Sequence, residues 1–284
     1  FKSMDKIALI CDSTSDLKSE TYSKYNIKML PFKIIYKNEE YLDRISIEPS
    51  EVYSRLPEEI PTTSLPDLQT IDDTFSEVEK EGFTHAIVIS ISSGLSGTFN
   101  AINLVAENHP KLKIHVFDSR TLSIGTGLTV LKCAEMIEKG FDFDTIVKEL
   151  PIYQSHTSMF FVIDTLVYLK AGGRIGKVAG TLGELLNIKP IISVNEDGVY
   201  YIYSKARGKK QGLNKLISIA KESLAKGPCF VCVMHGGAED QAKFVYSQIK
   251  DDPNLKGTYF SDISPTAGVH TGAGLVGVAI AESY

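Results

Sequence analysis

The sequence predicts an α/β fold of two domains: a parallel sheet with helices on both faces, followed by a second, mixed α/β unit. Three observations lead to it. Apolar runs of strand length alternate with runs of helical periodicity, a hairpin signal appears only in the second half, and 284 residues exceed the usual size of one domain. We place residues 4–158 in the N-terminal domain and residues 159–284 in the C-terminal domain.

Apolar runs in the N-terminal half end in small polar residues and then lead into helices. We expect strands at 6–11, 29–36, 85–91 and 114–117. We expect one helix that ends at residue 24, helices at 49–56 and 67–81, one helix that begins near residue 99 and one that begins after residue 121. Several residues between Asp12 and Asp16 are suitable caps for the first helix, and residues 61–66 are predicted to form a loop. The repeated order of strand, loop and helix indicates parallel strands joined by crossover helices.

The pattern of predicted elements changes near Met159. We expect a helix at 162–171, a hairpin of 190–196 and 199–203 around Asp197-Gly198, helices at 211–225 and 239–249, and strands at 229–234, 259–263 and 274–281. Residues 265–274 are predicted to form a glycine-rich loop that carries His270. Since such permissive backbone costs entropy to order, a functional role is expected for this loop.

Composition excludes several classes of function. Lysine plus arginine total 30 and aspartate plus glutamate total 35, so the net charge of −5 gives no reason to expect nucleic acid or a membrane surface as partner. The basic run at 205–210 is a local exception. No stretch approaches the roughly 20 apolar residues that span a bilayer, and we expect no charged-then-apolar leader before the first strand. We therefore expect no stable membrane insertion and a cytoplasmic location.

The cysteines and histidines do not predict a metal or redox site. Cys229 and Cys232 form a C-x-x-C pattern, but the surrounding residues predict a buried strand, on which positions i and i+3 point to opposite faces. No two of the six histidines are spaced i, i+4 on a predicted helix. We expect no metal site.

The segment from Ser92 to Thr98 predicts an anion site. It joins a strand to a helix and contains three serines and a threonine. The first turn of a helix offers free N–H groups and partial positive charge, and ligands of such sheets bind beyond the carboxyl ends of strands. Neither a P-loop lysine nor a G-x-G-x-x-G pattern is present. The predicted anion is therefore smaller than a polyphosphate.

Six motifs in series resemble the DegV family over essentially the whole chain. They are Asp12-Ser13-Thr14-Ser15-Asp16-Leu17, Thr63-Ser64-Leu65-Pro66, Ser93-Gly94-Leu95-Ser96-Gly97-Thr98, Gly172-Gly173-Arg174-Ile175, Lys189-Pro190-Ile191-Ile192 and His270-Thr271-Gly272. The resemblance implies a two-domain fold that binds one long-chain fatty acid at the domain interface, with no other cofactor. FakB-type members present that fatty acid to a separate kinase, which forms an acyl phosphate for phospholipid metabolism.

The resemblance also implies the site residues. Thr63, Ser96 and His270 match the family's contacts to the fatty acid carboxylate, and the N–H of Gly97 at the helix start would add a donor. Arg174 and Arg207 resemble arginines that engage the kinase. The chain departs from the family where Leu65 replaces a common glutamine and Ala273 a common proline. Leu65 is expected to change the cavity near the head group.

Other interpretations of these residues remain open. Thr63 and Ser96 are also plausible helix caps, and a loop histidine often only satisfies backbone groups. A second function is a serine-dependent acyl hydrolase with Ser96 as nucleophile and His270 as base. Because Gly97 directly follows the serine, the G-x-S-x-G nucleophile elbow is missing. A binding protein should show no ester turnover and should retain extracted lipid, which is the outcome we expect.

Overall fold

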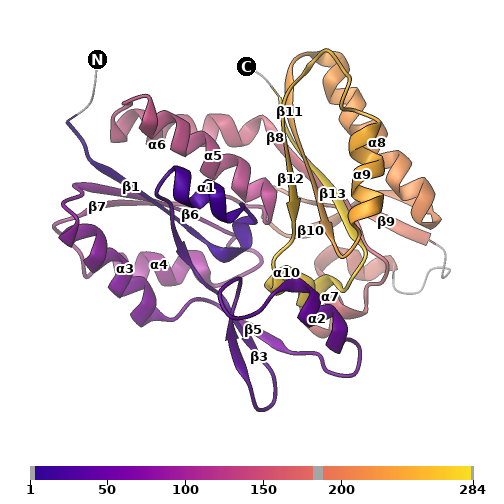
Figure 1. Ribbon diagram of the computed structural model, residues 1–284, viewed down its shortest axis with the longest axis horizontal. Helices are drawn as coiled ribbons and strands as arrows, with labels where there is room; N and C mark the ends of the chain where they lie inside the picture. The colour runs from indigo at the N-terminus through magenta and orange to yellow at the C-terminus, as the bar shows by residue number, and fades with distance from the viewer. Residues whose placement is uncertain (1–3, 182–187, 283–284) are drawn as a thin grey trace.

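The computed structural model describes residues 4–181 and 188–282, and Figure 1 shows their arrangement. Residues 182–187 and 283–284 of the predicted C-terminal domain lie outside the described residues. The first of three sheets in this part of the chain is parallel throughout, in the order β2-β1-β6-β7. Its strands are β1 (Ile7–Asp12), β2 (Lys28–Leu30), β6 (His85–Ser90) and β7 (Lys113–Asp118). The predicted parallel sheet is confirmed.

Helices cover both faces of this sheet because β1 and β6 are apolar on both faces. Ala8 and Val88 pack with α3 (Leu68–Lys80) and α4 (Thr98–Ala106) on one side. Leu9 and Ile87 pack with α5 (Ile124–Glu138) and α6 (Phe143–Ser155) on the other. Successive side chains of a strand point to opposite faces, so an uninterrupted apolar run specifies a strand buried between two layers. Figure 1 shows the two helix pairs on opposite sides of the sheet.

The second sheet is mixed and has the order β10-β9-β8-β13-β11-β12. Its strands are β8 (Thr157–Val162), β9 (Ile188–Val194), β10 (Tyr200–Arg207), β11 (Cys229–Gly236), β12 (Leu255–Asp262) and β13 (Leu275–Glu282). Only β11 and β12 pair in parallel. Helices α8 (Gly208–Lys226) and α9 (Glu239–Ser247) cover the outer face, as Figure 1 shows. The hairpin and the mixed second unit predicted from the sequence are confirmed.

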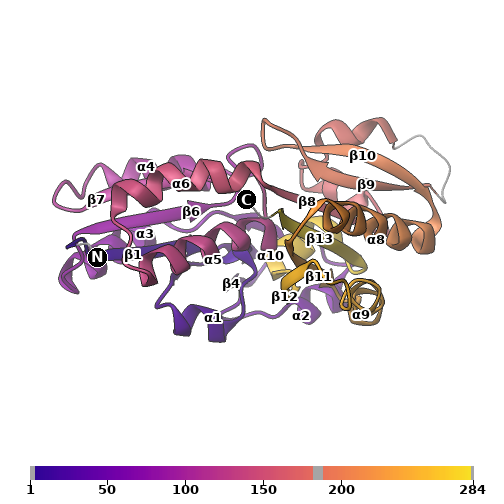
Figure 2. The ribbon, with the colours of Figure 1, turned by 90° about the horizontal axis from the view of Figure 1, so that it is seen from above.

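The two halves share one core. Helix α5 packs on β8 and β13, and Ile124 and Leu128 of α5 belong to the same buried cluster as Met159 and Ala279 of the second sheet. Figure 2 shows the chain passing from α6 into β8 between the two halves. The predicted boundary at residue 158 stays a prediction. Ligand cavities are often found in an apolar region where two parts of a chain meet.

The opposite faces predicted for the cysteines are also found. Cys232 belongs to the buried cluster between the sheets, whereas Cys229 belongs to the cluster under α8 and α9. Both thiols are free. Burial raises the pKa of each, so neither is a reactive thiolate at neutral pH.

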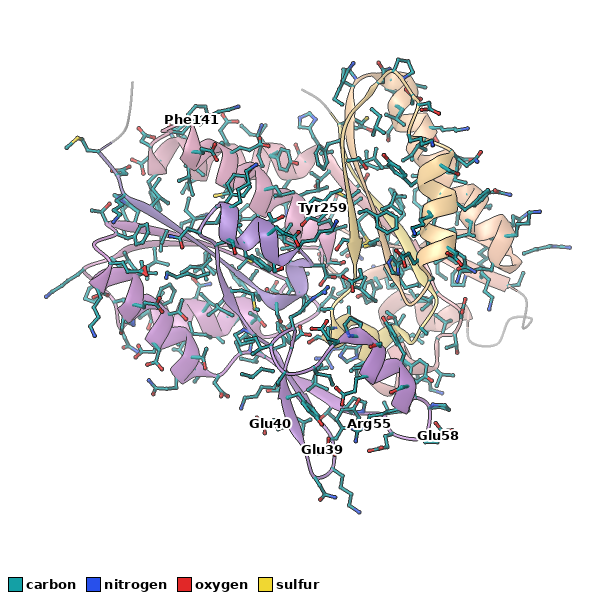
Figure 3. All side chains as sticks on the ribbon, in the orientation of Figure 1. Glu39, Glu40, Arg55, Glu58, Phe141 and Tyr259 are labelled. Carbon is teal, nitrogen blue, oxygen red and sulfur yellow. The ribbon has the colours of Figure 1, made fainter. Side chains whose placement is uncertain are left out.

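A third, antiparallel sheet contains β3 (Lys33–Ile35) between β4 (Glu40–Leu42) and β5 (Thr62–Ser64), beside α2 (Pro49–Arg55). The predicted strand 29–36 is therefore two strands in two sheets, since Pro31 lacks the N–H that a continuous ladder needs. Residues 62–64, predicted as loop, form its edge strand. Figure 3 shows Glu39, Glu40, Arg55 and Glu58 gathered at this end of the molecule.

Two further predictions in the C-terminal half are wrong in part. The predicted helix 162–171 begins as the end of β8, and only α7 (Val167–Ala171) is helical. The predicted loop 265–274 contains a helix, α10 (Pro265–Thr271), whose N-cap Ser264 accepts a hydrogen bond from the N–H of Ala267. Proline at the first helical position fits this start. The short helices η1 (Ser13–Ser15), α1 (Ser19–Lys24) and η2 (Gly176–Thr181) complete the fold.

Tyr259 ties the two halves together on the side away from the third sheet. Its hydroxyl on β12 accepts a hydrogen bond from the N–H of Lys18 at 2.6 Å and contacts Thr21 Oγ1 at 2.9 Å. Figure 3 shows Tyr259 between α1 and the second sheet. The seam is therefore pinned along α1 as well as along α5.

Candidate functional site

Three of the residues predicted to contact the carboxylate line one cavity between the two halves. Thr63 comes from β5, Ser96 from the loop before α4, and His270 from α10. This polar cavity has a volume of about 40 Å³. Its other lining residues include Thr14, Leu95, Arg174, Tyr200, Thr266 and Ala267. Elements far apart in the sequence thus place hydroxyls, an imidazole and a guanidinium around one space.

His270 meets Thr63 directly. His270 Nε2 and Thr63 Oγ1 lie 2.8 Å apart, whereas His270 Nδ1 is buried without a hydrogen-bond partner. Burial of the ring, together with the positive charge of Arg174, lowers the pKa of His270 to about 4. The imidazole is therefore neutral at pH 7, and binding of an anion beside it would favour its protonated form.

Thr63 is not a helix cap. It pairs with Ile34 across the third sheet, and α3 begins later, at Leu68, with Asp67 at its N-cap. The capping interpretation of Thr63 is therefore wrong. Its hydroxyl is positioned by the edge strand β5, which brings the third sheet into the wall of the polar cavity.

Ser96 lines the polar cavity and also supports the start of α4. Its Oγ accepts a hydrogen bond from the N–H of Thr98 at 3.2 Å and lies 2.8 Å from Thr98 Oγ1. Gly97 is the N-cap residue of α4 and follows Ser96, but it is not among the residues that line the cavity; Leu65 Cδ2 lies 3.3 Å from the position of a β-carbon at Gly97. The strand, loop and helix predicted around Ser92 to Thr98 are confirmed.

The two arginines lie in different places. Arg174 is in the wall of the polar cavity, where its Nε donates to the carbonyl of Leu95 at 3.3 Å and its Nη1 to the carbonyl of Gly172 at 2.6 Å. Arg207 is exposed at the end of β10, outside the cavity, and its N–H bonds the side chain of Gln211. Arg174 therefore adds positive charge where an anion would lie.

Thr266 is a cavity residue that the sequence did not predict. It lies four residues before His270 on α10, so the two side chains share a helix face. The residue is 4% exposed, and its Oγ1 has no hydrogen-bond partner of good geometry, although it lies close enough to the Asp43 carboxyl to help lower the pKa of that group. The i, i+4 spacing of Thr266 and His270 would place both side chains on one face, but it indicates this only if residues 265–271 are predicted to form a helix.

Two buried carboxylates hold the start of α10. Asp43 accepts hydrogen bonds from the hydroxyl of Ser13 at 2.6 Å and from the N–H of Thr266 at 3.2 Å. Asp16 accepts from the N–H of Ser264 at 3.0 Å. Burial raises the pKa of Asp16 to about 7 and that of Asp43 to about 6. Through these hydrogen bonds, the start of α10, the helix that carries His270, is tied to the segment Asp12–Leu17.

A second, apolar cavity borders the first. It has a volume of about 10 Å³ and shares Leu122, Tyr200 and Ala267 with the polar cavity. Its other lining residues include Met159, Phe161, Met234, Ile263 and Leu275. Together the two cavities form a slot with a polar end and an apolar end. Such a slot matches an amphipathic anion.

Ser96 and His270 do not form a nucleophile and base pair. Ser96 Oγ bonds Thr98, and His270 Nε2 bonds Thr63. A serine nucleophile requires a base within hydrogen-bond reach. Within residues 4–181 and 188–282, no three histidine, cysteine, aspartate or glutamate side chains are placed to hold a metal ion. In the same ranges, no helix has the length and apolarity needed to cross a membrane.

Comparisons with known proteins agree with this architecture. A family described as uncharacterised proteins of the DegV family matches residues 6–283. A DegV domain-containing protein of Clostridium acetobutylicum is 49% identical over 277 residues, which cover 98% of this chain and 99% of that protein. A solved DegV family structure from Thermus thermophilus, described by its fatty acid binding, has a TM-score of 0.92 at 26% identity and covers 98% of this chain and 100% of its own. A stearic-acid-binding protein from Eubacterium ventriosum has a TM-score of 0.87 at 28% identity and covers 98% of each chain.

Proposed function

Because this chain belongs to the DegV family, we propose that it binds one long-chain fatty acid in the slot between its halves. We propose further that it presents the carboxylate to a separate fatty acid kinase for conversion to an acyl phosphate. The proposal is carried by one observation: Thr63 and His270 meet at 2.8 Å at the polar end of a slot whose other end is apolar. The fatty acids bound by its structural neighbours support it.

The polar cavity offers the contacts that an ionised carboxylate needs. The hydroxyls of Thr63 and Ser96 and the N–H of Gly97 are uncharged donors, and Arg174 supplies positive charge. Hydrogen bonds to a carboxylate are roughly twice as strong as neutral ones, so these groups would fix the head group's position. Neutral donors also leave one carboxylate oxygen nucleophilic.

The apolar end would supply most of the affinity. At about 0.8 kcal/mol per buried methylene, a chain of some fourteen methylenes contributes on the order of 11 kcal/mol before the costs of ordering and association. Cavities that bury small ligands usually measure about 300–1,000 Å³. The two cavities here measure about 40 and 10 Å³. A long tail therefore fits only when the walls of the slot move apart.

The kinase step follows from the carboxylate's chemistry. An oxygen of the bound carboxylate would attack the γ-phosphoryl group of ATP held by the kinase, forming the acyl phosphate while ADP leaves. Exposed Arg207 would contact the kinase, and Arg174 would do so from the cavity wall. A non-enzymatic role for this chain, a cytoplasmic location and a part in phospholipid metabolism belong to the same proposal. The hydrolase alternative has less support, because Ser96 and His270 bond other partners.

Mass spectrometry of an organic extract of the purified protein tests the lipid-binding proposal. We expect about one equivalent of a fatty acid, and a double variant Thr63→Val with Ser96→Ala should retain far less. An activated ester assay runs beside it, and Ser96-dependent turnover would support the hydrolase instead. An extract that stays empty after incubation with fatty acids would contradict the proposal.

The kinase role has its own test. A fatty acid kinase, ATP and the loaded protein should together form acyl phosphate, and Arg207→Ala should lower that rate while leaving bound lipid unchanged. Arg207→Lys serves as the matched control, since it keeps the charge. Equal rates for wild type and Arg207→Ala would remove Arg207 from the kinase interface.

A further inference from the structure

The slot ends next to an open cleft. The cleft lies between the end of α6, the start of α5 and the strands β8 and β9, and it has a volume of about 580 Å³. Met159 is the residue that lines both this cleft and the apolar cavity. The polar cavity shares no lining residue with the cleft. The three spaces therefore lie in series, from polar cavity to apolar cavity to cleft, and Met159 separates the last two.

The sheet fixes the backbone of Met159. Strand β8 pairs with β13 there, with Met159 opposite Ala279, and Ser193 Oγ donates to the carbonyl of Met159 at 2.7 Å. Strand alternation puts Met159 and Phe161 on the side of the slot and Phe160 on the outer side. Figure 2 shows β8 at the junction of the two halves.

The side chain of Met159 is the part that can move. It is 4% exposed, and Met has three flexible side-chain bonds that let it fill irregular gaps and leave them again. Gly125 of α5 borders it closely, since a β-carbon there would lie 3.4 Å from Met159 Cβ. The cleft beyond provides the space into which the thioether would turn.

We propose that Met159 is a movable stop that sets the length of the acyl chain the slot accepts. This inference rests on the proposed fatty acid binding. A chain anchored by its carboxylate at Thr63 and His270 extends through the neck of Leu122, Tyr200 and Ala267 and ends against Met159. Carbons beyond that point enter a cleft lined by hydroxyl and amide side chains such as Ser155, Thr157, Ser193 and Asn195. Affinity should therefore rise about four-fold per methylene up to the stop and level off beyond it.

Met234 provides a matched control. It also lines the apolar cavity, but it does not line the cleft. It lies opposite Gly277 on β13, where a β-carbon would fall 2.4 Å from Met234 Cε. The side chain of Met234 thus fills the space over Gly277 and does not lie between the apolar cavity and the cleft. Truncating it should enlarge the cavity without opening the end.

Competition among saturated acids from lauric to arachidic acid tests the stop, with the bound fraction of each read by mass spectrometry. Met159→Ala should shift the preferred length upward by about two carbons, so that the ratio of arachidic to palmitic acid bound rises about fifteen-fold. Met159→Phe should shift the preference toward shorter acids. Met234→Ala, which enlarges the cavity without opening its end, should shift the preferred length by less than Met159→Ala does.

The outcomes separate the two proposals. A wild-type protein that binds none of the acids contradicts the lipid-binding function itself. A wild-type protein that binds them, with the same length profile in both Met159 variants, overturns the stop. An equal shift in Met234→Ala also overturns it, since the limit would then belong to the whole cavity. If Met159→Ala fails to fold, the shift in Met159→Phe decides.

Discussion

Gly172 faces the imidazole of His270 so closely that a β-carbon at Gly172 would lie 2.2 Å from His270 Nδ1. No pair of non-bonded heavy atoms tolerates that distance, so only glycine permits the ring's position. Gly172 is also the C-cap residue of α7, and its carbonyl accepts a hydrogen bond from the guanidinium of Arg174. Gly172 therefore helps to set the positions of both the His270 imidazole and the Arg174 guanidinium in the cavity.

Gly172→Ala should displace His270 and weaken fatty acid binding. Because overpacking costs about 1–3 kcal/mol, we expect about a ten-fold loss of affinity together with a lowered melting temperature. Titration with a fluorescent fatty acid measures the first and thermal unfolding the second. Gly180→Ala is the matched control, since a β-carbon there meets nothing within 4 Å. Equal affinities of Gly172→Ala and wild type would contradict this role.

Thr266→Val should weaken binding by removing a hydroxyl while keeping the side chain's shape. Thr266 Oγ1 is buried in the cavity without a hydrogen-bond partner of good geometry. A hydrogen bond to a charged group contributes about 1.5–3 kcal/mol, so we expect a loss of affinity of at least about ten-fold. Thr266→Ser should bind like wild type. Wild-type affinity in Thr266→Val would show that the hydroxyl does not contact the carboxylate.

His109 should make stability depend on pH. Its Nε2 lies 2.7 Å from Asp72 and its Nδ1 2.8 Å from Glu79. Burial favours the neutral ring, but the two carboxylates outweigh it and raise the pKa of His109. The stabilisation is therefore complete below the unfolded pKa of about 6.5 and is lost as the pH rises through the higher folded value.

Denaturant unfolding of His109→Gln at several pH values measures this effect. The variant should lose on the order of 1 kcal/mol in acid, since both carboxylates are partly exposed, and progressively less in alkali. A constant difference across the pH range would show that packing, rather than charge, accounts for the loss.

Ser92→Ala should speed fatty acid exchange. Ser92 Oγ donates to the carbonyl of Gly198 at 2.7 Å, so the β9–β10 turn contacts the loop that precedes Ser96. Arg120, in the loop after β7, donates to the carbonyl of Glu196 in the same turn at 3.1 Å. Since a tail fits only when the walls separate, weaker contacts here should raise the dissociation rate about five-fold, the equivalent of about 1 kcal/mol. Stopped-flow displacement measures it. Ser93→Ala, whose hydroxyl bonds Asp118 within the same half, should leave the rate unchanged.

The sequence revealed the long elements because their burial is repetitive. Runs such as 86–89 are apolar at every position, and only a strand between two helix layers needs that. Strands β3, β4 and β5 have three residues each, too few for any period to show. Helix α10 contains Gly268 and three threonine or histidine residues of modest helix propensity. It is helical because Ser264 and Asp43 satisfy its first N–H groups, a tertiary cause that local sequence does not carry.

The candidate site could be predicted only through motifs. Ser96 lies after a strand, where an anion site is expected, but nothing local connects it to Thr63 or His270. The resemblance supplied that connection, and the structure brings the three to one cavity. Arg174 was expected to engage the kinase; it lies in the cavity wall and bonds the carbonyl of Gly172, and its contact with a partner stays a prediction. The size of the slot depends on side chains from both halves and has no sequence signal.

The position of β13 means that the second sheet can be completed only after the end of the chain has been synthesised. This strand follows every other described strand in the sequence, yet it lies between β8 and β11 in the second sheet. During synthesis, β8 and β11 emerge from the ribosome without the neighbour that joins them, and the sheet remains divided until β13 arrives. Helix α10, with Thr266 and His270, immediately precedes β13. The proposed lipid site, to which α10 contributes Thr266 and His270, therefore becomes complete only when the last strand that closes the second sheet is made.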